Sequence, residues 1–416
     1  MKVAGIIAEY NPFHKGHAYQ IEEIKRQTGA DYVVVAMSGN FVQRGVPAAF
    51  DKYLRTEMAL LSGADLILEI PSRWSTASAE YFASAGVNLL GLTGCVDTIC
   101  YGVEDKASSM YDQVIAILYH APDAFQRELC AQQKEGLSYP AARVAALAKL
   151  LPQYDHDTLV TFLAKPNNIL GLEYEKAIAL WNEETTQAMH TLPILRQGNA
   201  YHSDVLEGEF ASATAIRLGL QDQITCHQAL QFIPESCCFA LEDALEAGLM
   251  VQEDAISLPL YYKLLAFQNE GYESFADCSS ALSHRIQNCL YEYRTFQSFC
   301  DTLKTKEITR ARIQRVLLHI LLDIKKEDYL ARDPISQIPY LRVLGFQDRA
   351  TPLLSAIKEN ACVPLITKMA DASKCLSPEE FAFLQKEATI SHMYHALLPE
   401  GNSRFNEWNH PIVILK

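Results

Sequence analysis

Apolar residues in the first hundred positions form short runs that alternate with segments of helical spacing. The runs are rich in β-branched residues and end at Gly, Pro or polar residues, as buried parallel strands do, and the segments between them have an amphipathic period. The predicted strands are Val3–Ala8, Tyr32–Met37, Asp65–Ile70 and Thr98–Tyr101, and the predicted helices are Ala18–Gln27, Phe50–Ser62 and Ser75–Leu90. This alternation predicts an α/β fold with right-handed βαβ units and a Rossmann-like, doubly wound parallel sheet.

The remainder of the chain has a different pattern. Residues 106–180 are mostly helical in period, His190–Leu195 is a late strand, and Ser212 is a plausible N-cap of a further helix. Beyond Leu220 the periodicity is predominantly helical, with no βαβ rhythm. We therefore expect two domains, an α/β domain over residues 1–225 and a mainly helical region over residues 226–416.

Composition and charge narrow the class of protein. The chain has 416 residues, of which 49% are hydrophobic and 21% charged, and no apolar run reaches the length of about 18 residues that a membrane helix needs. Glu9 and Asn11 interrupt the first apolar run too early for a signal peptide, and eleven cysteines without CxxC pairs are typical of a reduced thiol set. We expect a cytoplasmic protein without membrane contact.

A net charge of −14 argues against non-specific coating of nucleic acid. The charge is uneven, however, because Lys304–Lys326 contains seven basic and two acidic residues. Within it, apolar residues form one stripe of a helix, and the basic residues lie on its polar side and just upstream. The segment is a candidate RNA-binding surface or, alternatively, a solvated helix face.

Candidate chemistry begins at the turn after the first strand, where Asn11-Pro12 is followed by His14-Lys15-Gly16-His17 at the start of a helix. A helix N-terminus at the carboxyl end of a parallel strand attracts phosphate. Gly16 permits close backbone approach, and two imidazoles donate to oxygens that gain charge when an α-phosphorus is attacked. The alternatives are a metal site at i, i+3 spacing, for which no third ligand is evident, and a surface turn.

A second motif lies at the later helix start and has the form Ser212-x-Thr214-x-x-Arg217. Two hydroxyls and main-chain amides at such a position hold phosphates, and a guanidinium binds them bidentately. The same string also occurs as a simple capped amphipathic helix.

Together the two motifs resemble the HxGH nucleotidyltransferase superfamily. Longer stretches are similar to the bacterial tRNA(Met) cytidine acetate ligase family, and the resemblance covers nearly the whole chain. These stretches are Ala8–His17, Ser38–Gly45, Pro166–Tyr174, Ser212–Arg217, Lys304–Lys306 with Thr309–Arg315, and Arg342–Phe346.

The resemblance implies ATP-dependent activation of acetate to acetyl-adenylate with loss of pyrophosphate. It further implies acetylation of the 4-amino group of the wobble cytidine in elongator tRNA(Met), which gives N4-acetylcytidine. The partners would be that tRNA and acetate, with no stable protein partner. Mg²⁺ is expected to enter bound to ATP, with no protein ligand for it. Residues 1–225 would be the nucleotidyltransferase-like catalytic domain and residues 226–416 the tRNA-binding region.

The resemblance also implies site residues. The catalytic residues are His14, His17 and Arg217. The ATP-binding residues are Ile7, Ala8, Glu9, Tyr10, Asn11, Pro12, Phe13, His14, Lys15, Gly16, His17, Ala18, Tyr19, Gln20, Gly102, Asn168, Arg196, Gln197, Ser212 and Thr214. The tRNA-binding residues are Lys304, Lys306, Arg310, Arg312 and Arg315.

The loop Ser38–Gly45 follows the second strand and should border the same cleft, where Gln43 and Arg44 would orient acetate or RNA unless the loop is only a structural anchor. The polar residues Asp51, Lys52 and Arg55 on the next helix predict a solvated face. Two other functions stay open. One is a small-metabolite adenylyltransferase that makes a dinucleotide cofactor, and the other is a non-catalytic nucleotide- or tRNA-binding protein.

Overall fold

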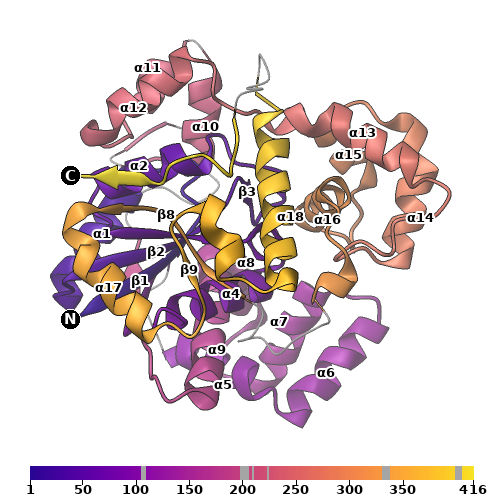
Figure 1. The fold of residues 1–416 in the computed structure, drawn as a ribbon. Coiled ribbons are helices and arrows are strands. Elements are labelled where there is room, and N and C mark those ends of the chain that lie inside the picture. The colour runs from indigo at the N-terminus through magenta and orange to yellow at the C-terminus, as the bar shows by residue number, and fades with distance from the viewer. Residues whose placement is uncertain (105–108, 197–205, 209, 223, 330–337, 399–404) are drawn as a thin grey trace.

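The computed structural model describes residues 1–104, 109–196, 206–208, 210–222, 224–329, 338–398 and 405–416 (Figure 1). Its centre is a sheet with the strand order β10-β8-β5-β2-β1-β6-β7, and β9 pairs with β8 beside this path. The strands are β1 Val3–Ala8, β2 Tyr32–Ser38, β5 Leu66–Ile70, β6 Thr98–Val103, β7 His190–Leu195, β8 Leu341–Gln347, β9 Leu365–Ile366 and β10 Val413–Leu415. The predicted α/β class is confirmed, and the five predicted strands are present.

One strand pairing differs from the prediction. β8 runs antiparallel to β5, whereas β1, β2, β5, β6 and β7 are mutually parallel, so the sheet is mixed. The region beyond Leu220, which we expected to be mainly helical, also contributes three strands that were not predicted, β8, β9 and β10. The sheet therefore takes strands from both sides of the expected domain boundary.

Successive residues of each strand point to opposite faces of the sheet, and each face is covered by a layer of helices. Val34 and Leu68 pack on one face against helices α4 (Ala79–Gly91), α9 (Pro166–Glu184) and α17 (Thr351–Asn360). Val33 and Val35 pack on the other face. There the covering helices are α1 (Lys15–Thr28), α2 (Lys52–Leu61), α10 (Ala213–Gln221), α11 (Cys226–Leu230) and α12 (Glu235–Glu246). This period of two is what a sheet buried on both faces requires.

Two helical blocks flank the sheet. The first contains α5 (Ser109–His120), α6 (Asp123–Lys134), α7 (Tyr139–Leu150) and α8 (His156–Ala164), and its helices α5, α6 and α7 lie in the lower part of Figure 1. The second, which we call the helical lobe, contains α13 (Ser257–Ala266), α14 (Ser280–Cys289), α15 (Phe296–Leu303) and α16 (Arg310–Leu322), and it lies on the right. The long helix α18 (Pro378–His395) contributes to the core of the lobe, as does a hairpin made of β3 (Phe41–Val42) and β4 (Val46–Pro47).

The expectation of a solvated face on α2 is wrong. Lys52 is 2% exposed, and its ammonium binds Glu69 at 2.8 Å and Glu407 at 2.6 Å. Arg342 from β8 binds the same two carboxylates, so four buried charges join α2, β5, β8 and the chain near residue 407. Buried charges persist only when they are paired in this way.

Among the described residues no helix combines the length and the apolar character needed to cross a membrane. The short helix α3 (Ser72–Ser75) follows β5 and leads into the turn at Thr76 and Ala77, whose Ala77 carbonyl accepts a hydrogen bond from Gln43, a residue of the site described next.

Candidate active site

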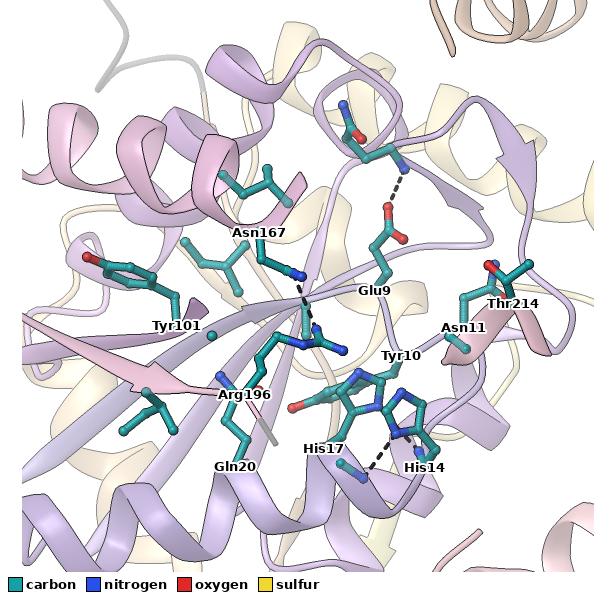
Figure 2. A pocket seen from close by; sticks show the side chains of 18 of the residues that line it. Glu9, Tyr10, Asn11, His14, His17, Gln20, Tyr101, Asn167, Arg196 and Thr214 are labelled. Carbon is teal, nitrogen blue, oxygen red and sulfur yellow. Dashed lines mark hydrogen bonds between the residues drawn. The ribbon is translucent and has the colours of Figure 1, made fainter. Parts of the chain in front are cut away.

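A pocket lies where β1, β6 and β7 end and where helices α1 and α10 begin (Figure 2). The described residues that line it come from these elements and from the β3–β4 hairpin, α4 and α9. They are Ile7, Ala8, Glu9, Tyr10, Asn11, His14, Gly16, His17, Tyr19, Gln20, Gln43, Arg44, Val46, Phe82, Tyr101, Gly102, Asn167, Leu170, Tyr174, Ile194, Leu195, Arg196, Ala213, Thr214 and Arg217. The carboxyl edge of a parallel sheet is where α/β proteins bind nucleotides.

His14 and His17 form the first turn of α1. His14 is the N-cap, and its Nδ1 accepts the main-chain N–H of Gly16 at 3.1 Å. In return, Nδ1 of His17 accepts the main-chain N–H of His14 at 3.3 Å. A neutral imidazole whose Nδ1 accepts a hydrogen bond carries its proton on Nε2, so both rings have an Nε2–H left for a ligand.

Both rings are held neutral. Burial, together with the nearby Arg196 and Arg217 guanidiniums, lowers the pKa of His14 to about 3. Burial, His14 and Arg196 also hold the pKa of His17 well below its usual value. The positive charge of Arg196 and Arg217, which disfavours protonation of these rings, also favours an anionic ligand beside them.

Gly16 is required by the position of the His14 ring. A Cβ on Gly16 would lie 2.9 Å from Cε1 of His14, closer than real Cβ contacts. Gly102 at the end of β6 has the same relation to Arg196, since a Cβ there would lie 3.1 Å from Cγ of Arg196. Each glycine therefore makes room for a polar side chain that lines the pocket.

Arg196 crosses the pocket from the end of β7. Its Nη1 donates to the side-chain oxygen of Asn167 at 3.3 Å, and the Asn167 amide donates to Glu104 at 2.7 Å. Figure 2 shows the guanidinium lying between Asn167 and the His14–His17 pair. Asn167 at the start of α9 was not predicted as a site residue, although its neighbour Asn168 was.

The second motif reaches the same pocket. Arg217 donates to the main-chain oxygen of Asn11 at 2.6 Å and to the hydroxyl of Thr214 at 3.3 Å, so α10 is tied to the turn after β1. Ser212 is the N-cap of α10, as predicted, because its hydroxyl accepts the N–H of Ala215 at 3.0 Å. Thr214 and Arg217 line the pocket, whereas Ser212 supports the helix end.

Tyr10 supplies a buried polar atom without a protein partner. Its side chain is 1% exposed, and within the described part of the chain its hydroxyl makes no hydrogen bond. The Tyr10 ring packs against the His17 ring with a centroid separation of 4.8 Å. A buried hydroxyl in this state indicates a hydrogen-bonding ligand in the pocket.

The loops around the pocket are fixed by Arg55, which is fully buried. Its Nη1 donates to the main-chain oxygens of Glu9 at 2.7 Å and Ser38 at 3.0 Å, and its Nη2 donates to that of Gly39. One guanidinium thus satisfies carbonyls that follow β1 and β2. The sequence pattern placed this side chain in solvent.

Most predicted ATP-binding residues come together in the pocket, but six do not line it. Phe13 is buried in the core, Lys15 is exposed, and Asn168 is buried with its amide donating to the oxygen of Phe162 and its oxygen accepting the N–H of Glu104. The others are Pro12, Ala18 and Ser212, and Gln197 lies outside the described residues. The lining residues that we did not predict are Val46, Phe82, Tyr101, Asn167, Leu170, Tyr174, Ile194, Leu195 and Ala213. The only sequence signal that could have indicated some of these residues is their position at the end of a predicted strand.

The predicted tRNA-binding residues lie on and before α16. Lys304 and Lys306 are exposed. The arginines are paired with acids, since Arg310 binds Asp301 and both Arg312 and Arg315 bind Asp277, the latter at 2.7 Å. The three arginines therefore also hold the helical lobe together, which the sequence pattern did not reveal.

A strand–turn–helix with HxGH at the helix start, faced by a second helix N-terminus, defines a nucleotidyl transferase of the HxGH class. The family model described as HIGH Nucleotidyl Transferase matches residues 1–408. Curated relatives narrow this class. The chain is 36% identical over 426 residues to the tRNA(Met) cytidine acetate ligase of Halothermothrix orenii, with 100% of both chains covered. It is 35% identical over 400 residues to that of Acetivibrio thermocellus, with 95% and 94% covered.

The chain belongs to the tRNA(Met) cytidine acetate ligase family. Solved structures agree with this assignment. The apo structure of Thermotoga maritima TmcAL superposes with a TM-score of 0.92 at 29% identity, and that of TmcAL bound with alpha-thio ATP superposes with a TM-score of 0.90 at 28% identity. Both comparisons cover 100% of each chain.

Proposed function

We propose that this protein activates acetate with ATP and transfers the acetyl group to the 4-amino group of the wobble cytidine of elongator tRNA(Met). One observation carries the ATP half of the proposal. The N-termini of α1 and α10 open into one pocket, with the neutral His14 and His17 on the first and Thr214 and Arg217 on the second. The RNA half is supported by the names of the relatives.

In the first step an acetate oxygen attacks the α-phosphorus of ATP, the bond to the bridging oxygen of pyrophosphate breaks, and acetyl-adenylate forms. The Nε2–H groups of His14 and His17 donate to the α-phosphate oxygens, whose charge grows in the transition state. Arg217 and Thr214 hold the leaving β- and γ-phosphates at the start of α10. The Tyr10 hydroxyl is a further donor or acceptor for the bound nucleotide.

In the second step the 4-amino nitrogen of cytidine attacks the acetyl carbon. AMP leaves, and the nitrogen loses one proton. Because the wobble base belongs to an unpaired loop, it reaches the pocket without the cost of opening a duplex.

Acetate needs a cation and a small apolar surface. We assign both to the β3–β4 side of the pocket, where Arg44 and Gln43 lie near Val46 and Phe82. Arg217 and Thr214, the residues proposed for pyrophosphate, belong to a different element, α10. An in-line displacement puts the attacking and leaving oxygens on opposite sides of the phosphorus.

Magnesium would enter with the triphosphate. Within the described ranges no three His, Cys, Asp or Glu side chains gather closely enough to hold a metal ion, and Glu9 is the single carboxylate among the lining residues. This donor set fits a metal bound through phosphates and water, which Mg²⁺ accepts. Bound there, the ion neutralises charge on the leaving pyrophosphate.

We further propose a functional division at residue 225, with catalysis in residues 1–225 and tRNA binding in residues 226–416. In support, every described lining residue of the pocket precedes residue 218. The basic residues Lys304, Lys306, Arg310, Arg312 and Arg315 all lie in the helical lobe. Such an RNA-modifying enzyme would work in the cytoplasm, where its tRNA is.

The test is to incubate the purified protein with elongator methionine tRNA, ATP and labelled acetate and then to analyse the nucleosides. We expect labelled N4-acetylcytidine, and none with a transcript that carries uridine at the wobble position. Adenylation of a mononucleotide in place of tRNA acetylation would reject the proposal in favour of a small-metabolite adenylyltransferase.

A further inference from the structure

The wall of the pocket that carries Gln43 and Arg44 is built into the helical lobe. Phe41, Val42 and Val46 of the β3–β4 hairpin are buried in the same core as the helices α13 to α16. The turn of the same hairpin lines the nucleotide pocket. The position of this wall is therefore set by packing in the lobe that we propose for RNA binding.

The hairpin meets α16 at the level of the main chain. Gly45 has a φ of 79°, and a Cβ on it would lie 2.6 Å from the carbonyl carbon of Gln314. A left-handed residue with no room for a side chain has to be glycine. This contact places the hairpin turn directly against the second helical turn of α16.

His319 makes a second connection from the same helix, one turn after Arg315. It is 1% exposed, and its Nε2 lies 3.0 Å from the main-chain oxygen of Thr76 and 3.2 Å from the Thr76 hydroxyl. Its Nδ1 lies 3.1 Å from the main-chain oxygen of Ala276. A neutral imidazole donates from one nitrogen only, so with its proton on Nε2 the ring donates to the Thr76 carbonyl and lies beside the Ala276 carbonyl, between two separate turns.

The Thr76 turn leads into the pocket. The next carbonyl, that of Ala77, accepts the side-chain N–H of Gln43 at 3.2 Å. The main-chain N–H of Gln43 donates to the Glu9 carboxylate at 2.8 Å, and Glu9 lines the pocket at the end of β1. His319, Thr76–Ala77, Gln43 and Glu9 form a continuous series of contacts.

The Ala276 turn leads to the proposed RNA surface. The next residue, Asp277, binds Arg315 at 2.7 Å and Arg312 at 3.2 Å. A phosphate that binds these arginines competes with Asp277 for the same guanidinium hydrogens. The turn on one side of His319 thus carries the acid that pairs with Arg312 and Arg315, and the turn on the other side contacts the pocket wall at Gln43.

We propose that His319 is a positioning residue for the nucleotide pocket, because through Thr76–Ala77 it holds Gln43 and Glu9 where ATP and acetate bind. Any influence of bound RNA on the pocket through His319 rests on the function proposed above, since it requires Arg312 and Arg315 to contact tRNA. The effect on ATP binding does not require that function.

Two substitutions distinguish the contact made by Nε2 of His319 from the contact made by Nδ1. The amide nitrogen of Gln reaches the place of Nε2, and that of Asn reaches the place of Nδ1. His319→Gln therefore keeps the contact to Thr76, and His319→Asn keeps only the contact to Ala276. The matched controls are His284→Gln and His284→Asn, at an exposed position on α14 of the same lobe.

The readouts are the Kd of ATP, measured directly, and the KM values in acetate-dependent ATP–pyrophosphate exchange without RNA. For His319→Asn we expect ATP Kd and acetate KM to rise about fivefold to tenfold, the effect of one lost hydrogen bond in a buried site. For His319→Gln we expect values within about twofold of the unmodified protein. A purely structural role would lower the thermal stability of both variants while leaving Kd and KM of the folded fraction unchanged, and this result would overturn the proposal.

Gln43→Ala provides an independent check if His319→Asn does not fold, because it removes the side-chain hydrogen bond from Gln43 to the Ala77 carbonyl, through which His319 is proposed to act. A folded Gln43→Ala protein with unchanged ATP Kd and acetate KM would also overturn the proposal. If the unmodified protein shows no acetate-dependent exchange, the proposed function fails, but the ATP Kd of the same variants still decides the role of His319.

Discussion

The imidazole rings of His14 and His17 stack with their centroids 3.8 Å apart, and each Nδ1 accepts a main-chain N–H of the same helical turn. The two side chains close a reciprocal capping box, which is usually made by hydroxyl and carboxylate groups. Because capping uses both Nδ1 atoms, both Nε2–H groups are oriented before a ligand arrives. The stability of the helix start and the donor geometry of the site therefore depend on the same two residues.

His17→Ala should lower the rate of acetate-dependent pyrophosphate release by about a hundredfold, because it removes one donor to the α-phosphate transition state. The measurement is ATP–pyrophosphate exchange at saturating ATP. Glu22→Ala is the matched control, since Glu22 is exposed on the same helix and does not line the pocket. An unchanged rate in His17→Ala would restrict His17 to its capping role.

The buried His14 should make the protein less stable in mild acid. Burial holds the pKa of His14 at about 3, whereas an unfolded chain has a histidine pKa of about 6.5. Below pH 6.5 the unfolded chain therefore binds a proton that the folded protein does not bind, so the free energy of unfolding falls as the pH falls. Between pH 7 and pH 5 this one residue should cost about 2 kcal/mol.

Urea unfolding of His14→Asn at pH 7 and pH 5 tests this, because Asn is a good N-cap without a titrating group. The variant should lose about 2 kcal/mol less than the unmodified protein between the two pH values. His156→Asn, at an exposed position in the first turn of α8, should leave the pH dependence unchanged. Equal pH dependence in all three proteins would contradict the assignment of His14 as a buried neutral ring.

Arg44→Gln should raise the KM of acetate by tenfold to about a hundredfold, the usual effect of a lost hydrogen bond to a charged group. The Kd of ATP should change much less, because the phosphates are assigned to His14, His17, Thr214 and Arg217. Exchange kinetics with varied acetate measure the first quantity, and direct binding measures the second. Arg26→Gln, which removes an exposed arginine of α1, is the control. A larger effect on ATP than on acetate would move Arg44 to the nucleotide side.

The parts of the fold that could be predicted are those with local signals. Each predicted parallel strand is an apolar run bounded by breakers, and Ser212 caps a helix as expected. The short strand β10 has three residues, and β8 is an apolar run among helices, so their places in the sheet depend on pairing with distant strands. Such pairing leaves no local pattern.

The side chains whose environment was not predicted also depend on distant parts of the chain. Charged side chains on a helix predict solvent, yet Arg55 and Lys52 are buried because distant carbonyls and carboxylates accept their hydrogens. Asn167 and Asn168 are equivalent in sequence, and the rotation of α9 decides that Asn167 faces Arg196. Neither relation can be derived without the three-dimensional arrangement.

Removing Lys304 and Lys306 should weaken tRNA binding without affecting ATP. Both side chains are exposed, whereas Arg315 is 12% exposed and paired with Asp277, so the lysines can be changed without breaking a partly buried ion pair. If both contact phosphates, the double change to Ala should reduce the slope of log affinity against log salt by about 1.5. Filter binding between low and high salt measures this slope.

The double change to Ala at Lys368 and Lys374, which are 72% and 76% exposed, removes the same charge elsewhere and should leave the slope unchanged. Equal slopes for the two double variants would exclude Lys304 and Lys306 from the RNA contact, and a parallel loss of ATP–pyrophosphate exchange would point to a defect in folding.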